Sequence, residues 1–369
     1  MTQETPQPGA GQPLRVGVVG LGWAGQQHLE AYTRIPGIEV TALAAMETDQ
    51  LTKLADEFQV QNRYSRWEDM LEAEKLDAIS IAVPTFLHAP IAIAALERGI
   101  HVLSEKPIAK DSVEAQAMVD AARAAGRVLD VAFNHRRRGD ILALKSVIDG
   151  GEIGRPYYAK AAWLRRRGIP TLGSWFTNPA LAGGGPLVDI GVHVLDYALH
   201  LLGEPKVLSV SATTHSELGP RGLGGNSRYS ALAGGNQFEV EDFSSAFLRL
   251  EGGGALLIEA GWASYRNPDD EINFLVYGTE GGAELRVAGE PMPEAGHLTV
   301  YKDTGEDNSD YSPAIGANGM HQRVVEDFVE VVRAGSEEWG RHDGSLALGR
   351  ARIIDACYRS AREGREVQL

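Results

Sequence analysis

Asp189 and His193 stand four residues apart, and their side chains suit acid–base chemistry. Residues at this spacing share one face of a helix, and the apolar pattern predicts a helix over residues 190–202. An imidazole can accept a hydroxyl proton near neutral pH while a hydride leaves the carbinol carbon. Asp189 can orient the substrate or the imidazole and stabilise the imidazolium. The pair therefore predicts a site for alcohol oxidation or carbonyl reduction.

Asp196 and His200 continue the same polar stripe, which raises the question of a metal site. The four residues span about 16 Å along a helix, too far to share one ion. We therefore predict no metal, and we interpret Asp196 and His200 as a solvated face.

Lys106 is a third candidate because it follows an apolar strand predicted over residues 101–103. Ligands of open α/β sheets bind at the carboxyl ends of the strands. A lysine ammonium there can polarise a carbonyl, contact the nicotinamide side of a cofactor, or lower the pKa of a substrate hydroxyl. The alternative is a structural pair between Glu105 and Lys106.

A glycine-rich turn matches the dinucleotide pattern G-x-G-x-x-G at Gly20, Gly22 and Gly25. The turn follows a strand and opens a helix near Trp23 and Ala24, whose N-terminus would hold a pyrophosphate. The expected ribose-binding acid falls instead on Ala45. Glu47, or backbone groups at Ala45 and Met46, could replace it, and no Arg stands nearby in the sequence. NAD is therefore slightly favoured, and NADP stays open.

The pattern of elements predicts two domains after a disordered lead-in at residues 1–13. Residues 14–135 alternate strands with helices, which indicates a Rossmann doubly wound parallel sheet in an α/β domain. In residues 136–369 strand-like segments dominate, which indicates an α+β domain with a largely antiparallel open sheet that binds substrate. Its expected helices cover residues 190–202, 321–334 and 345–363. Residues 216–236 are rich in Gly and Ser and predict a long mobile loop whose role stays open.

Other polar and aromatic residues are candidates for contacts to ligands. We place Pro84, His88 and Glu105 near the cofactor, although a lone histidine in a turn is as often structural. Arg136, Arg166 and Trp175 are candidate substrate-binding residues, since Arg binds charged oxygens and Trp stacks on a sugar face. For Arg136 we prefer an internal ion pair.

Composition narrows the class of protein. The net charge of -15 argues against nucleic-acid binding. The single cysteine, Cys357, excludes an intramolecular disulfide framework. No apolar run approaches the roughly 18 residues that span a bilayer. The polar N-terminus lacks the features of a signal peptide, so we expect a cytoplasmic protein without a membrane partner.

Several motifs together resemble the Gfo/Idh/MocA oxidoreductases (glucose–fructose oxidoreductase, inositol dehydrogenase and their relatives) along almost the whole chain. These motifs are the strand that ends in Glu105-Lys106-Pro107, the turn at residues 84–88, the D-x-x-x-H pattern of Asp189 and His193, and the closing segment at residues 360–367. In this family the bond before that proline is often cis.

The resemblance implies an NAD(P)-dependent dehydrogenase or reductase that transfers a hydride between nicotinamide and a sugar, cyclitol or related polyol. His193 would be the acid/base, and Lys106 would polarise the oxygen. Two other functions occur among relatives: a nucleotide-binding regulator without chemistry, and a glycosidase that uses tightly bound NAD in a transient redox cycle.

The second-domain sheet also suggests assembly. Residues 243–248 and 255–258 carry apolar side chains at successive positions, so both faces of the sheet need cover. We therefore expect a homodimer or homotetramer that forms through this sheet.

Overall fold

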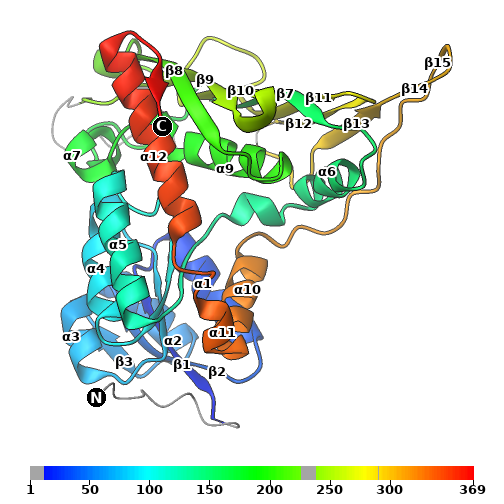
Figure 1. The fold of residues 1–369 in the computed structure, drawn as a ribbon. Coiled ribbons are helices and arrows are strands. Elements are labelled where there is room, and N and C mark those ends of the chain that lie inside the picture. The colour runs from blue at the N-terminus through cyan, green and yellow to red at the C-terminus, as the bar shows by residue number, and fades with distance from the viewer. Residues whose placement is uncertain (1–11, 226–237, 290) are drawn as a thin grey trace. The chain divides into compact units, whose positions relative to one another are not determined.

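Two separate sheets organise the chain, one parallel and one mostly antiparallel, as the sequence predicts. The computed structural model describes residues 12–225, 238–289 and 291–369. The lead-in through residue 11 and most of the predicted loop, residues 226–236, lie outside these ranges. The described chain divides into two compact units (Figure 1). The first ends at Asn134 and takes in Met320–Gly349, and the second comprises His135–Gly319 and Arg350–Leu369.

The first unit is a six-stranded parallel sheet with helices between the strands. The strand order is β3-β2-β1-β4-β5-β6, which is that of a Rossmann fold. The strands are β1 (Leu14–Val19), β2 (Ile38–Ala44), β3 (Asn62–Tyr64), β4 (Ala78–Ile81), β5 (His101–Ser104) and β6 (Leu129–Val131). The helices are α1 (Trp23–Arg34), α2 (Thr48–Glu57), α3 (Trp67–Ala73), α4 (His88–Leu96) and α5 (Ser112–Ala125), followed late in the chain by α10 (Met320–Ala334) and α11 (Ser336–Trp339).

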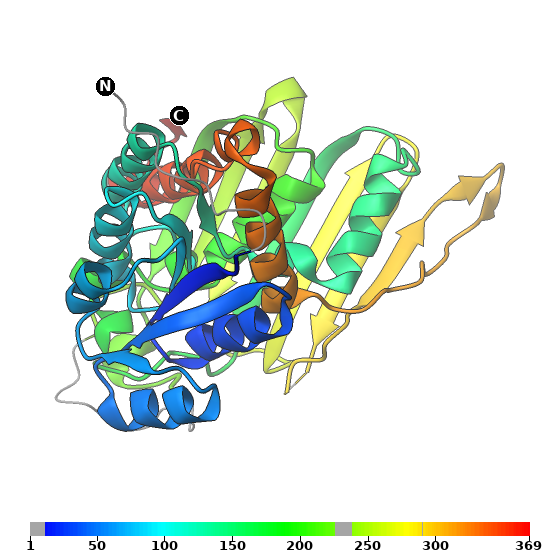
Figure 2. The same cartoon turned by 90° about the horizontal axis from the view of Figure 1, so that it is seen from below.

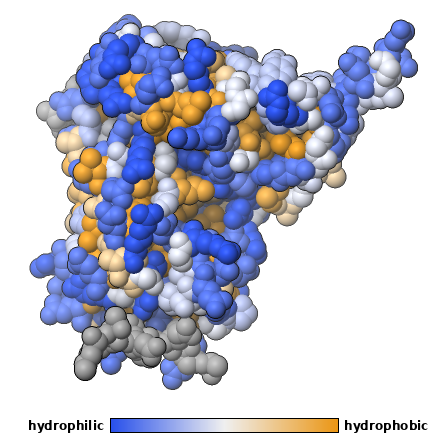
Figure 3. Space-filling view, viewed as in Figure 1, coloured by the Kyte–Doolittle hydropathy of each residue, from blue (hydrophilic) through white to orange (hydrophobic). Residues whose placement is uncertain are grey.

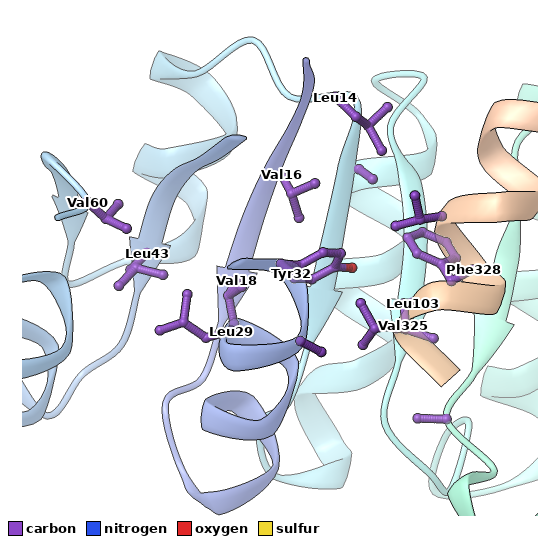
Figure 4. Close-up of a cluster of buried hydrophobic side chains, with 14 of the residues drawn as sticks. Leu14, Val16, Val18, Leu29, Tyr32, Leu43, Val60, Leu103, Val325 and Phe328 are labelled. Atoms are coloured by element: carbon purple, nitrogen blue, oxygen red, sulfur yellow. The ribbon is translucent and has the colours of Figure 1, made fainter. Parts of the chain in front are cut away.

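Helix α10 belongs to this first unit, whereas the sequence placed all of residues 136–369 in the second domain. Its apolar residues Val325, Phe328, Val329 and Val332 are buried in the same core as Tyr32 of α1 (Figure 4). Helical spacing puts these side chains on one face of α10. The apolar face shows that α10 must be buried, but it does not show which of the two sheets buries it. The sequence therefore predicts a domain boundary that leaves α10 in the second domain.

The second unit contains an eight-stranded mixed sheet. Its strands are β7 (Pro156–Arg165), β8 (Val207–His215), β9 (Phe243–Leu250), β10 (Ala255–Gly261), β11 (Asp270–Gly278), β12 (Gly282–Ala288), β13 (His297–Tyr301) and β16 (Val367–Gln368). Their order is β13-β12-β11-β7-β10-β9-β8-β16 (Figure 2), and only the β7–β10 pair is parallel. The helices are α6 (Gly139–Asp149), α7 (Pro179–Ala182), α8 (Pro186–Asp189) and α9 (Gly191–Leu201), and α12 (Ser345–Glu363) ends in this unit.

The strands of this sheet alternate buried and half-exposed residues, so the sheet has one covered and one more open face. In β9 the even-numbered residues from Ser244 to Leu250 are buried, and the odd-numbered ones are half-buried or exposed. Helices α6, α8 and α9 contact the sheet. Helix α6 was not predicted, although Ile141, Leu144, Val147 and Ile148 are buried at helical spacing.

A small hairpin extends beyond the sheet. Its strands are β14 (Asp303–Thr304) and β15 (Asp307–Asn308), and their residues are exposed. The hairpin, at the upper right of Figure 3, is hydrophilic on the side shown. In the described part of the chain, no helix has the length and apolar character needed to cross a membrane.

Candidate functional site

The glycine turn of the first unit forms a close-packed backbone bend with one open position. Gly20 has φ +87°, and a Cβ on it would lie 2.2 Å from the carbonyl oxygen of Ala82. A Cβ on Gly25 would lie 2.0 Å from the carbonyl oxygen of Gly20. A Cβ on Gly22, by contrast, would meet no described atom within 4 Å. A ligand can therefore approach the backbone of the turn at Gly22, which is the position where the dinucleotide pattern brings the pyrophosphate close.

The N-terminus of α1 is suited to hold an anion. The helix begins at Trp23, its first turn has no acidic residue, and no side chain caps it. The first N–H groups of a helix have no intrahelical acceptor and carry a partial positive charge. Together with the open position at Gly22, these groups fit a cofactor pyrophosphate. Trp23 is 66% exposed at this point.

The end of β2 presents the residues that we expect beside the adenosine ribose. Ala45 is buried, while Met46 is 79% exposed and Glu47 is exposed at the N-terminus of α2. The sequence showed no arginine near this position, but in the structure the neighbouring strand β3 leads to one. β3 pairs in register with β2 (Ala44 with Tyr64), and Arg66 follows β3 two residues later. The sequence separation hid this arginine.

Glu105, at the end of β5, is a buried carboxylate with three N–H donors. Its Oε1 lies 3.2 Å from His28 Nε2 and 3.3 Å from His321 Nε2. Its Oε2 accepts a hydrogen bond of 3.1 Å from the backbone N–H of Lys106. Burial alone would raise the pKa of Glu105, but the hydrogen bonds from the two histidines hold this pKa well below its usual range. Neither His28 nor His321 was identified from the sequence.

His88, which we expect near the cofactor, contacts the backbone of the turn that carries Lys106. Its Nδ1 lies 2.8 Å from the carbonyl oxygen of Pro107, and its Nε2 lies 2.9 Å from that of Val83. The side chain is buried, and burial lowers its pKa. Backbone carbonyls therefore contact both ring nitrogens of His88. The Lys106–Pro107 bond is cis, as the resemblance implied.

In the second unit, Asp189 ends α8 and His193 lies in the first turn of α9. Trp262 donates its indole N–H to Asp189 Oδ2 at 2.9 Å. The His193 ring lies 4.4 Å from the ring of His135, centroid to centroid, and 5.9 Å from that of Trp163. His193 therefore lies among aromatic rings, four residues after a carboxylate that accepts a hydrogen bond from an indole.

The arginine run at residues 165–167 divides between two environments. The Arg165 guanidinium lies 4.8 Å from the Trp163 ring and 3.3 Å from Asp270. Arg166, the predicted substrate residue, is exposed and contacts the backbone oxygen of Arg266 at 3.2 Å. Of the two, Arg165 lies closer to the rings around His193. Trp175, the other candidate, is half-buried and stacks on Phe176 at 3.8 Å.

A buried carboxylate holds the N-terminus of α8, which leads to Asp189. Glu241 accepts hydrogen bonds of 3.0 Å from the backbone N–H groups of Gly185 and Leu187, and one of 2.8 Å from the Tyr358 hydroxyl. Burial raises the pKa of Glu241 despite these donors. A Cβ on Gly184 would lie 2.0 Å from the Tyr358 hydroxyl oxygen. Close packing therefore explains the glycines before Asp189. Neither Glu241 nor Tyr358 belongs to a motif that is visible in the sequence.

Arg136 forms the internal ion pair that we preferred over a substrate contact. Its guanidinium donates to Asp196 at 2.5 and 2.7 Å and to Glu204 at 3.0 Å. Arg350 donates to the same two carboxylates. Asp196 is 1% exposed, so our prediction of a solvated face is wrong there. Burial lowers the pKa of neighbouring His200 to about 4.

The described residues contain one cluster of metal-ligand types, at His28, Glu105 and His321, with one ligand atom from each within 4.8 Å of the others. The prediction of no metal rested on the polar residues near His193 and did not include this cluster. Within this cluster, both histidines contact the Glu105 carboxylate at hydrogen-bond distance.

Comparison with known proteins finds similarity along most of the chain. Residues 14–133 match the family described as "Oxidoreductase family, NAD-binding Rossmann fold", and residues 141–284 match the "GFO/IDH/MocA C-terminal domain". The chain is 31% identical to D-glucoside 3-dehydrogenase of Escherichia coli K12, with 97% of this chain and 98% of the relative covered. It is 30% identical to levoglucosan dehydrogenase of Pseudarthrobacter phenanthrenivorans, with 95% and 96% covered.

A solved structure of levoglucosan dehydrogenase, in complex with NADH and levoglucosan, superposes on the chain with a TM-score of 0.81. The sequence identity is 26%, and the match covers 97% of this chain and 100% of that one.

Proposed function

We propose that this chain, which belongs to the Gfo/Idh/MocA family of oxidoreductases, oxidises a secondary hydroxyl of a pyranose sugar or glycoside. Its enzyme class follows from the family: the chain is an NAD(P)-dependent oxidoreductase that acts on the CH–OH groups of sugars and related polyols. The finer proposals concern the residues, the cofactor and the substrate.

His193 is the acid/base in this proposal, and the observation that carries it is the hydrogen bond from the Trp262 indole to Asp189, four residues before His193. Asp189 accepts this hydrogen bond and ends α8, and His193 belongs to α9. A carboxylate so placed can fix the substrate hydroxyl toward His193 or stabilise the imidazolium that forms. His193 takes the hydroxyl proton, and Lys106 polarises the substrate oxygen. The cofactor, when bound, supplies the nicotinamide that accepts or returns the hydride.

The same residues favour a cyclic sugar as substrate. A pyranose presents C–H groups on its ring faces and hydroxyls at its rim, so it is matched by aromatic rings with flanking charged groups. Trp163 and His135 supply rings beside His193, and Arg165 and Asp270 supply charge next to Trp163. The relatives named for D-glucoside and levoglucosan support a sugar of this kind.

For the cofactor we propose NAD, with Glu47 on the ribose hydroxyls. A carboxylate accepts hydrogen bonds from those hydroxyls and repels a 2′-phosphate. Arg66, which follows the neighbouring strand β3, favours NADP, although its guanidinium lies 3.7 Å from Glu68. The pyrophosphate would rest on the N-terminus of α1.

A substrate panel tests the function. Purified enzyme is incubated with NAD or NADP and with levoglucosan, methyl glucosides, free aldoses, myo-inositol and open-chain polyols, and the absorbance of reduced nicotinamide is followed. We expect turnover with pyranose substrates, with His193→Ala as the inactive control.

The two other functions predict different results in the same panel. A nucleotide-binding regulator would bind the cofactor and turn over nothing. A glycosidase of this fold would copurify with NAD and cleave a glycoside without net formation of NADH.

A further inference from the structure

His321 contacts two parts of the first unit that the proposed chemistry uses. Its Nε2 lies 3.3 Å from Glu105 Oε1, and its ring packs edge-on against Trp23 with 5.1 Å between centroids and 84° between planes. Trp23 follows Gly22 in the glycine turn, and Glu105 precedes Lys106. The side chain of His321 is 4% exposed. It belongs to α10, more than 200 residues after Glu105 in the chain.

The Glu105 carboxylate transmits the position of these donors to Lys106. Its Oε1 contacts the imidazoles of His28 and His321, and its Oε2 accepts a hydrogen bond from the backbone N–H of Lys106. The two oxygens belong to one rigid planar group, and each contacts its own donors, so a shift at one oxygen moves the other. A change at either histidine therefore reaches the Lys106 peptide through one rigid group.

The donors on His28 can be assigned from the chain of hydroxyls behind it. Tyr32 Oη lies 2.9 Å from Ser80 Oγ, which lies 3.0 Å from His28 Nδ1. If Tyr32 donates to Ser80 and Ser80 donates to His28 Nδ1, the proton of a neutral His28 is on Nε2 and points at Glu105. His321 can donate from Nε2 when its Nδ1 accepts from the Asn134 amide at 3.4 Å. The carboxylate is thus satisfied by N–H donors and needs no metal ion.

We propose that His321 is a positioning residue that fixes Lys106 through Glu105 and ties the lysine turn to Trp23 in the glycine turn. The inference rests on the proposed role of Lys106. Helix α10 is not one of the helices between the strands of the parallel sheet. In this proposal it aligns the glycine turn with the turn that carries Lys106.

Two substitutions of similar polarity separate the two contacts. In His321→Gln, the amide nitrogen reaches about as far as imidazole Nε2 and can still donate to Glu105. In His321→Asn, the amide nitrogen is close to the position of Nδ1 and does not reach. Both variants lose the ring that packs on Trp23. His342→Asn is the matched control, because His342 pairs with Asp130 at 3.0 Å elsewhere in the same unit.

We expect cofactor affinity and turnover to respond differently. Both His321 variants should bind NAD(H) about two- to tenfold more weakly, as loss of one aromatic contact predicts. The single-turnover rate of hydride transfer should stay within about threefold of wild type in His321→Gln and fall about 10- to 100-fold in His321→Asn, as expected for a misplaced catalytic group. His342→Asn should change neither. Equal hydride-transfer rates in the Gln and Asn variants would overturn the proposal.

The pH profile gives a second readout. Losing a donor in His321→Asn lets burial raise the pKa of Glu105, so the acid limb of the rate profile should move to higher pH. The charged and titratable groups that face Glu105 are His28 from α1, His321 from α10, His88 from α4, and adjacent Lys106. In a Glu105→Gln background this shift should disappear, and His321→Asn should add little further loss. Additive losses would show that His321 acts by another route.

Two further results are distinguishable. If Lys106→Ala turns over at the wild-type rate, the proposed function of Lys106 fails, and the positioning role fails with it. If Lys106→Ala is inactive while His321→Asn has the wild-type rate and pH profile, only the positioning role fails. Stoichiometric zinc released from the wild-type enzyme on denaturation would also overturn the proposal, since His321 would then be a metal ligand rather than a donor.

Discussion

The indole N–H of Trp262 donates to the carboxylate of Asp189 at 2.9 Å, at the start of the helix that carries His193. Trp262 is fully buried at the end of β10, and the indole fixes one carboxylate oxygen of Asp189. The sheet of the second unit therefore sets the geometry of the proposed acid/base pair.

Replacing Trp262 with Phe should remove this donor and keep most of the packing. We expect kcat to fall about tenfold or more, since a hydrogen bond to a charged group contributes about 1.5–3 kcal/mol. Cofactor affinity, measured by tryptophan fluorescence, should hardly change. Trp339→Phe is the matched control, because the Trp339 indole donates to backbone oxygens of Val331 and Val332 in the first unit. It should lose stability without losing kcat. Full activity in Trp262→Phe would contradict the assigned role of Asp189.

Lys106→Ala and His193→Ala should each fold normally and lose most turnover. Removing a general acid or base costs about 10²–10⁴ in rate. Circular dichroism and steady-state kinetics across pH test this prediction. Lys110→Ala and His200→Ala are matched controls, because Lys110 pairs with Glu114 and His200 faces Arg136. A wild-type kcat of His193→Ala at every pH would show that another group carries the proton.

The fold could be predicted because its signals are local. Alternating strands and helices before residue 135, and strand-rich segments after it, follow from side-chain periodicity along short stretches of chain. The position of α10 could not be predicted in this way. The apolar face of α10 is visible in the sequence, but its packing against Tyr32 joins residues almost 300 positions apart.

The same distinction between local signals and distant contacts applies to the residues of the candidate site. The glycine turn, Lys106, Asp189 and His193 were found because each belongs to a short motif with fixed spacing. Trp262, Glu241 and His321 have no motif, since a single buried Trp, Glu or His has the same appearance in sequence whether it is structural or functional. Asp196 was misjudged for a related reason: its arginine partners come from residues 136 and 350.

The cofactor preference depends on Glu47 and Arg66. We expect wild-type enzyme to bind NAD(H) at least as well as NADP(H). Glu47→Gln should weaken NAD(H) binding and strengthen NADP(H) binding, because it removes a charge that repels the 2′-phosphate. Arg66→Ala should weaken NADP(H) binding only. Titration of both nicotinamides against the three proteins measures this. A clear preference for NADP(H) that Glu47→Gln leaves unchanged would reject the assignment.

Glu105 should make stability depend on pH on the acid side. Its pKa is lowered in the folded protein, so its contribution is present above its ordinary pKa and is lost as the pH falls through its folded pKa. Glu105→Gln should therefore lower the melting temperature near pH 7, and the gap to wild type should narrow below about pH 4. Glu68→Gln, at an exposed position on α3, is the control and should show little gap at either pH. A gap for Glu105→Gln that stays constant from pH 7 to pH 3 would contradict the assigned hydrogen bonds.

Assembly through the second-unit sheet is the last prediction. One row of half-buried residues crosses its open face: Leu275, Lys160, Leu257 and Phe247 are neighbours in register on β11, β7, β10 and β9. Three of the four are large and apolar, and such a face is commonly buried by two-fold pairing.

We expect Leu257→Lys to dissociate the oligomer, because it places a second ammonium beside Lys160 in the centre of the proposed interface. Sedimentation velocity at micromolar concentration measures the result. The control is Leu142→Lys, since Leu142 is 44% exposed on α6, one of the helices that contact the sheet. We expect wild type and Leu142→Lys to sediment as dimer or tetramer, and Leu257→Lys to shift toward 39.7 kDa. Wild-type protein that sediments as a species near 39.7 kDa would refute assembly through this face.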